Sequence, residues 1–348
     1  MINRFVILSF AFINLLLGGT LEEITEGGIQ PPLFRAGEIT YASSDLLLQT
    51  LQPILEDHLE EINYDRLSAS LQIMNHFNSC SSFLMNELRD FNYVPIVDKG
   101  GPCVSISLDL IKRLPNWIKA YLVGAQLPAK YQQFAFPLYC HTAVMIRYQN
   151  PHESNDSGYI ILDPSFDLPI PILINHETVF KYTRPGRDHW TMWLKDNQIM
   201  CQLAPFSELK NYVADDYLMI YRTDSFVNPI QASAIPMLIA DRRLSLLSRD
   251  RTGKHFCSIS VELDRNRVVW SIDQVQQPPI FFTDFLNGKT LPRSVSKALC
   301  LKTEELNGKI KQAIELKPIL DRVFFEYLNF IEKYQDHSIT GKLNSHPE

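Results

Sequence analysis

The sequence predicts a mixed α+β protein in which helices come first, strands fill the middle and helices return at the end. Apolar residues recur every three or four positions between Ser44 and Leu88, which indicates amphipathic helices. Short runs of branched and aromatic residues, separated by turn residues, dominate residues 120–275. A helical pattern returns over residues 303–335. This order differs from the regular alternation of strand and helix that builds a doubly wound parallel sheet.

Length and composition are those of a globular protein with two or three subdomains. The chain has 348 residues, of which 45% are hydrophobic and 21% charged, so a buried core is feasible. The net charge is −6, and no basic patch stands out. Because nucleic-acid binding depends on clustered lysine and arginine, this balance argues against DNA or RNA as the main partner.

The six cysteines are scattered, and no CxxC pair occurs among them. They are Cys80, Cys103, Cys140, Cys201, Cys257 and Cys300. This spacing fits neither a zinc ribbon nor a dense disulfide scaffold, so no metal site is expected. A reducing, cytoplasmic compartment is the simpler interpretation, because a working thiol survives there.

The N-terminus gives a competing indication of location. Arg4 precedes an apolar run over residues 5–17, and small residues follow, which is the outline of a secretory signal. The run is short for a membrane span, and no clear cleavage site follows it. We therefore expect a cytoplasmic protein without a stable membrane span, and secretion is the alternative if residues 1–20 act as a signal.

Three residues form the candidate catalytic set: Cys103, His141 and Asp163. Cys103 follows Gly100, Gly101 and a proline. The apolar pattern of the residues after Cys103 fits a strand or a helix equally well. His141 opens one predicted strand and Asp163 closes the next, with a polar connection that suits a hairpin between them. Neighbouring antiparallel strands can place two side chains on one face. Asp163 is therefore expected to hold a ring nitrogen of His141, with His141 facing Cys103.

Thiol chemistry needs these residue types. The thiolate is the nucleophile, and a neighbouring imidazolium or a helix N-terminus favours it. An aspartate fixes the tautomer of the histidine and stabilises its charged form. Gly100 and Gly101 are expected to leave room for a substrate beside the sulfur, and backbone amides there to bind an oxyanion. Such a contact is worth roughly 3–4 kcal/mol.

The motifs "KGGPC", "CHTAVMIRY" and "GYIILDPSF" together resemble the arylamine N-acetyltransferase family. That family has a glycine pair before its cysteine, a histidine that opens a strand, and an Asp-x-x-Phe pattern that closes the next. Asp163 and Phe166 match that pattern, and the interval from Cys103 to His141 is typical of the family. The segment "RLSLLSRDR" resembles a later strand of the family, so the likeness covers about residues 65–275.

The resemblance implies a cysteine-proteinase-like core with an N-terminal helical bundle, a central β-barrel and a C-terminal α/β lid. The expected divisions are an N-terminal extension over 1–43, a bundle over 44–118 that carries the nucleophile, a barrel over 119–275 that carries histidine and aspartate, and a lid with a helical tail over 276–348. It also implies a ping-pong reaction: an acyl-CoA such as acetyl-CoA, used as a cosubstrate, acylates Cys103, and an amine then accepts the acyl group. No permanently bound cofactor is implied.

The sequence departs from the family at positions that border the candidate site. Lys99 replaces the arginine of the motif, and Pro102 precedes the cysteine. Pro164 and Ser165 stand where the family has a small residue and a glycine, and Asp167 replaces a following glycine. These changes leave the acyl donor open. Transglutaminase- or peptidase-like amide chemistry with the same three residues, and a binding protein without catalysis, are the alternatives.

Overall fold

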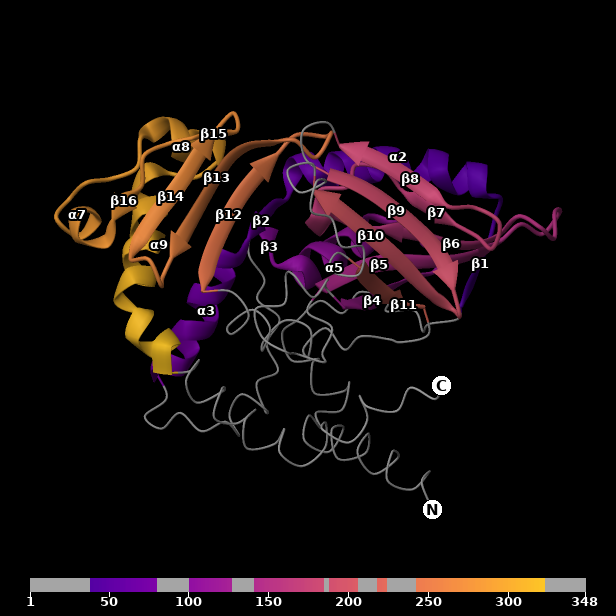
Figure 1. Cartoon of the computed structure of the whole chain (residues 1–348), viewed down its shortest axis with the longest axis horizontal. Helices are drawn as coiled ribbons and strands as arrows, with labels where there is room; N and C mark the ends of the chain where they lie inside the picture. Colours follow the sequence, from indigo (N-terminus) through magenta and orange to yellow (C-terminus); the bar gives the residue numbers. More distant parts are fainter. Residues whose placement is uncertain are drawn as a thin grey trace, which may run out of the picture.

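The computed structural model describes residues 38–79, 100–126, 141–184, 188–205, 218–223 and 242–322. In these residues the chain forms two β-sheets that lie side by side, each covered by helices (Figure 1). The α+β class expected from the sequence is confirmed. The N-terminal segment on which the prediction of location depends lies outside the described residues. No helix in the described ranges is both long and apolar enough to cross a membrane.

The first sheet curls into a nearly closed barrel. Its strands follow the order β7-β6-β5-β4-β11-β10-β9-β8, and β1 adds in parallel beside β5. The edge strands β7 and β8 follow each other in the chain and lie in contact. The strands are β1 (Ile39–Tyr41), β4 (Ala120–Gln126), β5 (His141–Gln149), β6 (Ser157–Leu162), β7 (Ile172–Ile174), β8 (Phe180–Arg184), β9 (Asp188–Lys195), β10 (Gln198–Pro205) and β11 (Leu218–Arg222).

The first six residues of strand β5 are buried, which explains the apolar run from Ala143 to Ile146. Val144 and Ile146 pack against helices α2 (Ser44–Glu61) and α5 (Cys103–Arg113). Ala143 and Met145 point the other way, into the barrel interior. Since side chains alternate along a strand, His141 shares the interior face with Ala143 and Met145. This alternation places the candidate histidine inside the barrel mouth.

The second sheet joins distant parts of the chain. Its order is β15-β14-β13-β12-β2-β3, with β16 beside β14. The strands are β2 (Asn63–Asp65), β3 (Gly100–Gly101), β12 (Arg243–Arg249), β13 (His255–Glu262), β14 (Arg267–Ile272), β15 (Val275–Gln276) and β16 (Ile280–Phe281). The helices on this side of the molecule are α3 (Arg66–Ser79), α7 (Phe282–Leu286), α8 (Arg293–Ala298) and α9 (Thr303–Glu315) (Figure 1). Their apolar side chains share one core with β12 to β14.

Each of the two sheets and its covering helices is built from segments that are not consecutive in the chain. Helix α2 packs on the barrel, whereas α3 packs on the second sheet and touches α9. The strands of residues 243–272 belong to the second sheet and not to the barrel. The boundaries expected from the sequence, over 1–43, 44–118, 119–275 and 276–348, stay predictions.

Candidate active site

Cys103 is the first residue of α5, directly after the capping residue Pro102. The backbone N–H of Ile106 donates to the Pro102 carbonyl at 3.0 Å and closes the first turn. The sequence after Cys103 fits a strand or a helix, and the structure shows a helix. The apolar face of this helix includes Val104 and Leu110, which pack in the core. Cys103, a half-buried residue, lies at the positive end of the helix dipole, which favours a thiolate.

The glycine pair before the cysteine is required by packing. Strand β3 pairs in parallel with β2, where Gly100 lies opposite Asn63. A Cβ on Gly100 would lie 2.9 Å from the Asn63 oxygen and 3.0 Å from the Asp65 Cβ. A Cβ on Gly101 would lie 2.6 Å from the Ser105 Cβ in the first turn of α5. The space beside both glycines is thus filled by the chain itself, and their role towards a substrate stays a prediction.

The β5–β6 hairpin brings His141 and Asp163 together. The last pair of its register joins Val144 to Leu162, so Asp163 follows on the same face as His141. His141 Nε2 lies 2.7 Å from Asp163 Oδ2, and both side chains are buried. The two side chains therefore share one face of neighbouring antiparallel strands and lie within hydrogen-bond distance of each other. It leaves His141 Nδ1 as the ring nitrogen available to Cys103.

Two further groups hold the Asp163 carboxylate. The hydroxyl of Tyr221 in β11 donates to Oδ2 at 2.6 Å, and the backbone N–H of Phe166 donates to Oδ1 at 3.2 Å. Ala125 in β4 lies opposite both His141 and Tyr221, so the three residues form a line across the sheet. Sequence reasoning missed Tyr221, because nothing distinguishes it from the other thirteen of the chain's 14 tyrosines.

Aromatic contacts confine the His141 ring. The Phe166 ring lies edge-on to it, with centroids 4.4 Å apart, and Trp190 packs against Phe166 at 5.4 Å. Trp190 is buried and donates its Nε1–H to Asp188 at 2.8 Å. The phenylalanine that matches the family pattern therefore lies between the histidine and a fixed tryptophan, which limits rotation of the imidazole.

The charges of the three candidate residues support one another. Burial raises the pKa of the Cys103 thiol, but the neighbouring imidazole of His141, together with Thr142, outweighs burial and lowers it. Burial lowers the pKa of His141, but the charge and hydrogen bond of Asp163, together with Cys103, raise it to about 10. Both shifts favour a thiolate–imidazolium pair at neutral pH.

Alkylation of Cys103 by iodoacetamide is therefore expected to be faster at pH 6 than that of an ordinary thiol, with its pH profile displaced to lower pH. The sign follows from the lowered thiol pKa, because the thiolate survives below the usual cysteine value of about 8.5. Peptide mapping after brief labelling at several pH values measures this profile. Cys300 is the internal control, since it is exposed and should label like an ordinary accessible thiol. Earlier labelling of Cys300 at pH 6 would contradict the assignment of the nucleophile.

The other described cysteines differ from Cys103. Cys201 and Cys257 are buried, and burial raises the pKa of both thiols, that of Cys257 to about 12. The apolar neighbours of Cys201, Cys257 and Cys300 in the sequence predict that all three are core thiols, and for Cys201 and Cys257 this is confirmed. The same expectation for Cys300 is wrong, because this residue adopts a left-handed conformation (φ 56°) just after α8 and is exposed. Cys80 and Cys140 lie outside the described residues.

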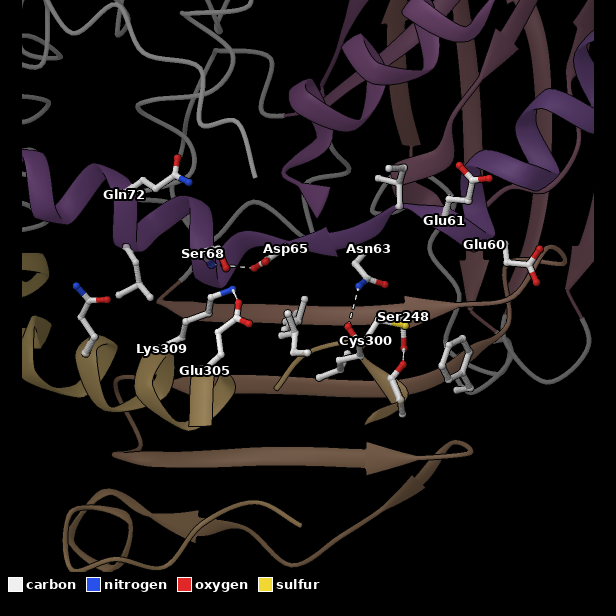
Figure 2. Close-up of a pocket in the computed structure, with 18 of the residues that line it drawn as sticks. Glu60, Glu61, Asn63, Asp65, Ser68, Gln72, Ser248, Cys300, Glu305 and Lys309 are labelled. Atoms are coloured by element: carbon white, nitrogen blue, oxygen red, sulfur yellow. Dashed lines mark hydrogen bonds and ion pairs between the residues drawn. The ribbon is translucent and has the colours of Figure 1, made fainter. Parts of the chain in front are cut away.

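A cavity of about 910 Å³ lies between α2, α3, the second sheet and the α8–α9 junction. Figure 2 shows polar side chains around it, among them Asp65, Glu305 and Lys309, with Cys300 at one side. No candidate catalytic residue belongs to its lining. In the described part of the chain, no group of three or more histidine, cysteine or acidic side chains is placed to hold a metal ion.

Replacing Tyr221 with phenylalanine is expected to lower the free energy of unfolding by about 1.5–3 kcal/mol, the usual cost of losing a hydrogen bond to a charged group. The matched control is Tyr121→Phe, because Tyr121 is also buried in the barrel but donates to the neutral Thr223 carbonyl at 3.4 Å. That change should cost about 0.5–1.5 kcal/mol. Urea unfolding measures both, and equal costs would contradict a charge-assisted bond to Asp163.

The comparison with solved structures finds arylamine N-acetyltransferases. The enzyme of M. smegmatis is 13% identical and covers 86% of this chain and 98% of its own, with a TM-score of 0.42. The Mycobacterium abscessus enzyme is 11% identical and covers 78% and 88%, with a TM-score of 0.46. The Mycobacterium marinum enzyme, solved in complex with CoA, is 12% identical and covers 85% and 99%, with a TM-score of 0.40. No protein-family model matches the sequence, and no curated protein matches it significantly.

Proposed function

We propose that the chain is an acyltransferase that moves an acetyl or other short acyl group from a CoA thioester to an amine through Cys103. The observation that carries the proposal is that His141 Nε2 lies 2.7 Å from Asp163 Oδ2, while the same imidazole lowers the pKa of the Cys103 thiol at the start of α5. The order and spacing of these residues in the sequence resemble the arylamine N-acetyltransferases. Together they supply a nucleophile, a proton carrier and a group that orients it.

In the first half-reaction the Cys103 thiolate attacks the thioester carbonyl of the donor. A bond forms between Cys103 Sγ and the acyl carbon, and the bond from that carbon to the CoA sulfur breaks. The CoA thiolate leaves with the proton that the His141 imidazolium gives up. Cys103 is then acylated and His141 is neutral.

In the second half-reaction the acceptor amine attacks the acyl carbon of the Cys103 thioester. His141 accepts the proton that the nitrogen loses, and the bond from the acyl carbon to Sγ breaks. The product amide leaves, and the thiolate–imidazolium pair is restored. Asp163 orients the His141 ring in both half-reactions, and its hydrogen bond from Tyr221 keeps it aligned with His141.

Intact-mass spectra after incubation with acetyl-, propionyl- and malonyl-CoA test the proposal. We expect a covalent acyl adduct with at least one donor, absent from Cys103→Ala and removed by an arylamine. Peptide mapping should place the adduct on Cys103. If none of the three donors forms an adduct although Cys103 alkylates readily, the result counts against the proposal and favours amide or peptide chemistry. Hydrolysis of amide substrates without CoA would then identify peptidase- or transglutaminase-like chemistry.

A further inference from the structure

The loop after Asp163 is held by a buried charge cluster that sequence reasoning did not find. Residues 164–166 form a short 3-10 helix, and Asp163 Oδ1 caps it through the Phe166 N–H. The next residue, Asp167, has a φ of 58°. Such a left-handed conformation suits glycine, which the resembling family has here, and aspartate tolerates it. The departure from the family is therefore compatible with the backbone, and it adds a carboxylate.

Both oxygens of that carboxylate contact positive or titratable groups from the second sheet. Oδ1 accepts from Arg249 Nη1 at 2.5 Å, and Oδ2 lies 2.5 Å from His255 Nε2. Asp167 is buried; burial raises the pKa of its carboxyl, but His255 and Arg249 outweigh burial and hold it well below its usual range. Arg249 ends β12 and His255 opens β13, so one hairpin supplies both partners.

Arg249 connects this loop to helix α2. Its Nη1 also donates to the Pro164 carbonyl at 2.5 Å, while Nε and Nη2 approach the carbonyls of Leu59 and Ile62 at 3.4 Å. The side chain is completely buried, so these acceptors replace water around the guanidinium. The two carbonyls at the end of α2 add the favourable, negative end of a helix dipole.

The β12–β13 hairpin packs closely against the loop after Asp163. Gly253 in the hairpin turn has a φ of 73°, and a Cβ there would lie 2.1 Å from the Asp167 backbone oxygen. From the barrel side, Arg184 donates to the Phe166 carbonyl at 2.7 Å and forms a two-point pair with Asp188. The loop that carries the Asp163 cap is thus fixed from two sides.

We propose that Arg249 and Asp167 are positioning residues for the candidate catalytic set: their buried ion pair fixes the loop that orients Asp163 and thereby His141. This inference rests on the proposed function for its catalytic meaning. Lysine cannot replace Arg249, because a single ammonium group cannot reach the loop and the end of α2 in the same geometry. Displacing a group in an active site by about 1 Å can cost on the order of 100-fold in rate.

The test compares Arg249→Lys and Asp167→Asn with Arg251→Met. Arg251 lies in the same hairpin and pairs with Asp57 and Glu60 of α2, but it is exposed, and no described contact joins it to residues 163–168. Thermal unfolding identifies the folded variants. Their pH profile of Cys103 alkylation then reports on the thiolate–imidazolium pair, which a purely structural role would leave unchanged.

For Arg249→Lys and Asp167→Asn we expect alkylation at pH 6 to fall on the order of tenfold or more, with the profile displaced towards that of an ordinary thiol. Arg251→Met should retain the original profile. Unchanged pH profiles of Cys103 alkylation in the two test variants would overturn the proposal. If Arg249→Lys does not fold, the profile of Asp167→Asn is the test. Alkylation needs no acyl donor. It therefore tests whether the Arg249–Asp167 ion pair positions the candidate catalytic residues even if no acyl-CoA forms an adduct and the proposed function fails.

Discussion

Cys103→Ala and His141→Ala are each expected to lower the rate of acyl transfer by on the order of 10⁴-fold or more, and the double variant by no more than either single change. The reason is that the two side chains act as one unit. Without the sulfur no acyl-enzyme forms, and without the imidazole the thiol loses the partner that lowers its pKa. Steady-state rates with the best acyl-CoA donor and an arylamine measure all three variants.

Matched controls separate this effect from a general loss of structure. Cys300→Ala removes an exposed thiol outside the candidate site, and His189→Ala removes a barrel histidine that contacts Thr183 at 2.9 Å. Both controls should keep nearly full activity. Circular dichroism should show the same fold in every variant. Losses that multiply in the double variant would mean that Cys103 and His141 have separate roles, and the thiolate–imidazolium mechanism would be wrong.

The proximity of His141 and Asp163 follows from local sequence because it depends on a single hairpin. A polar turn between two alternating strands fixes the register, and the register fixes which side chains share a face. The same local reasoning could not decide whether residues 103–113 form a strand or a helix. Burial of Val104 and Leu110 against β5 and α2 decides that, and those partners come from elsewhere in the chain.

The contacts around Asp163 could not be predicted, because they join residues that are distant in the sequence. The hydroxyl of Tyr221 reaches Asp163 across 58 positions, and Arg249 reaches Asp167 across 82. Each contact depends on how strands assemble into sheets, which no local pattern encodes. The surroundings of the glycine pair also could not be predicted from the local sequence. From the sequence, Gly100 and Gly101 suggest access for a substrate, but the structure places β2 and Ser105 against them.

Asp163 offers the sharpest test of how the candidate site works, because its carboxylate accepts three hydrogen bonds and is fully buried. With aspartate in place, His141 Nε2 carries a proton and Nδ1 is free to accept one from Cys103. The asparagine in Asp163→Asn has only one acceptor oxygen, for which Tyr221 and Phe166 compete. Its amide then donates to Nε2 and moves the ring proton to Nδ1.

Asp163→Asn is therefore expected to lower acyl transfer by on the order of 10⁴-fold while leaving the fold intact, as the wrong histidine tautomer does in related chemistry. The pH dependence gives the mechanism. Without the carboxylate the His141 pKa falls from its raised value of about 10, so the imidazolium that stabilises the thiolate is lost at neutral pH. Cys103 alkylation should become slow at pH 6 and recover only above the ordinary thiol pKa of about 8.5, because burial raises the pKa of the thiol once the imidazolium is lost. A variant that alkylates at the original rate at pH 6 would show that Asp163 does not control His141.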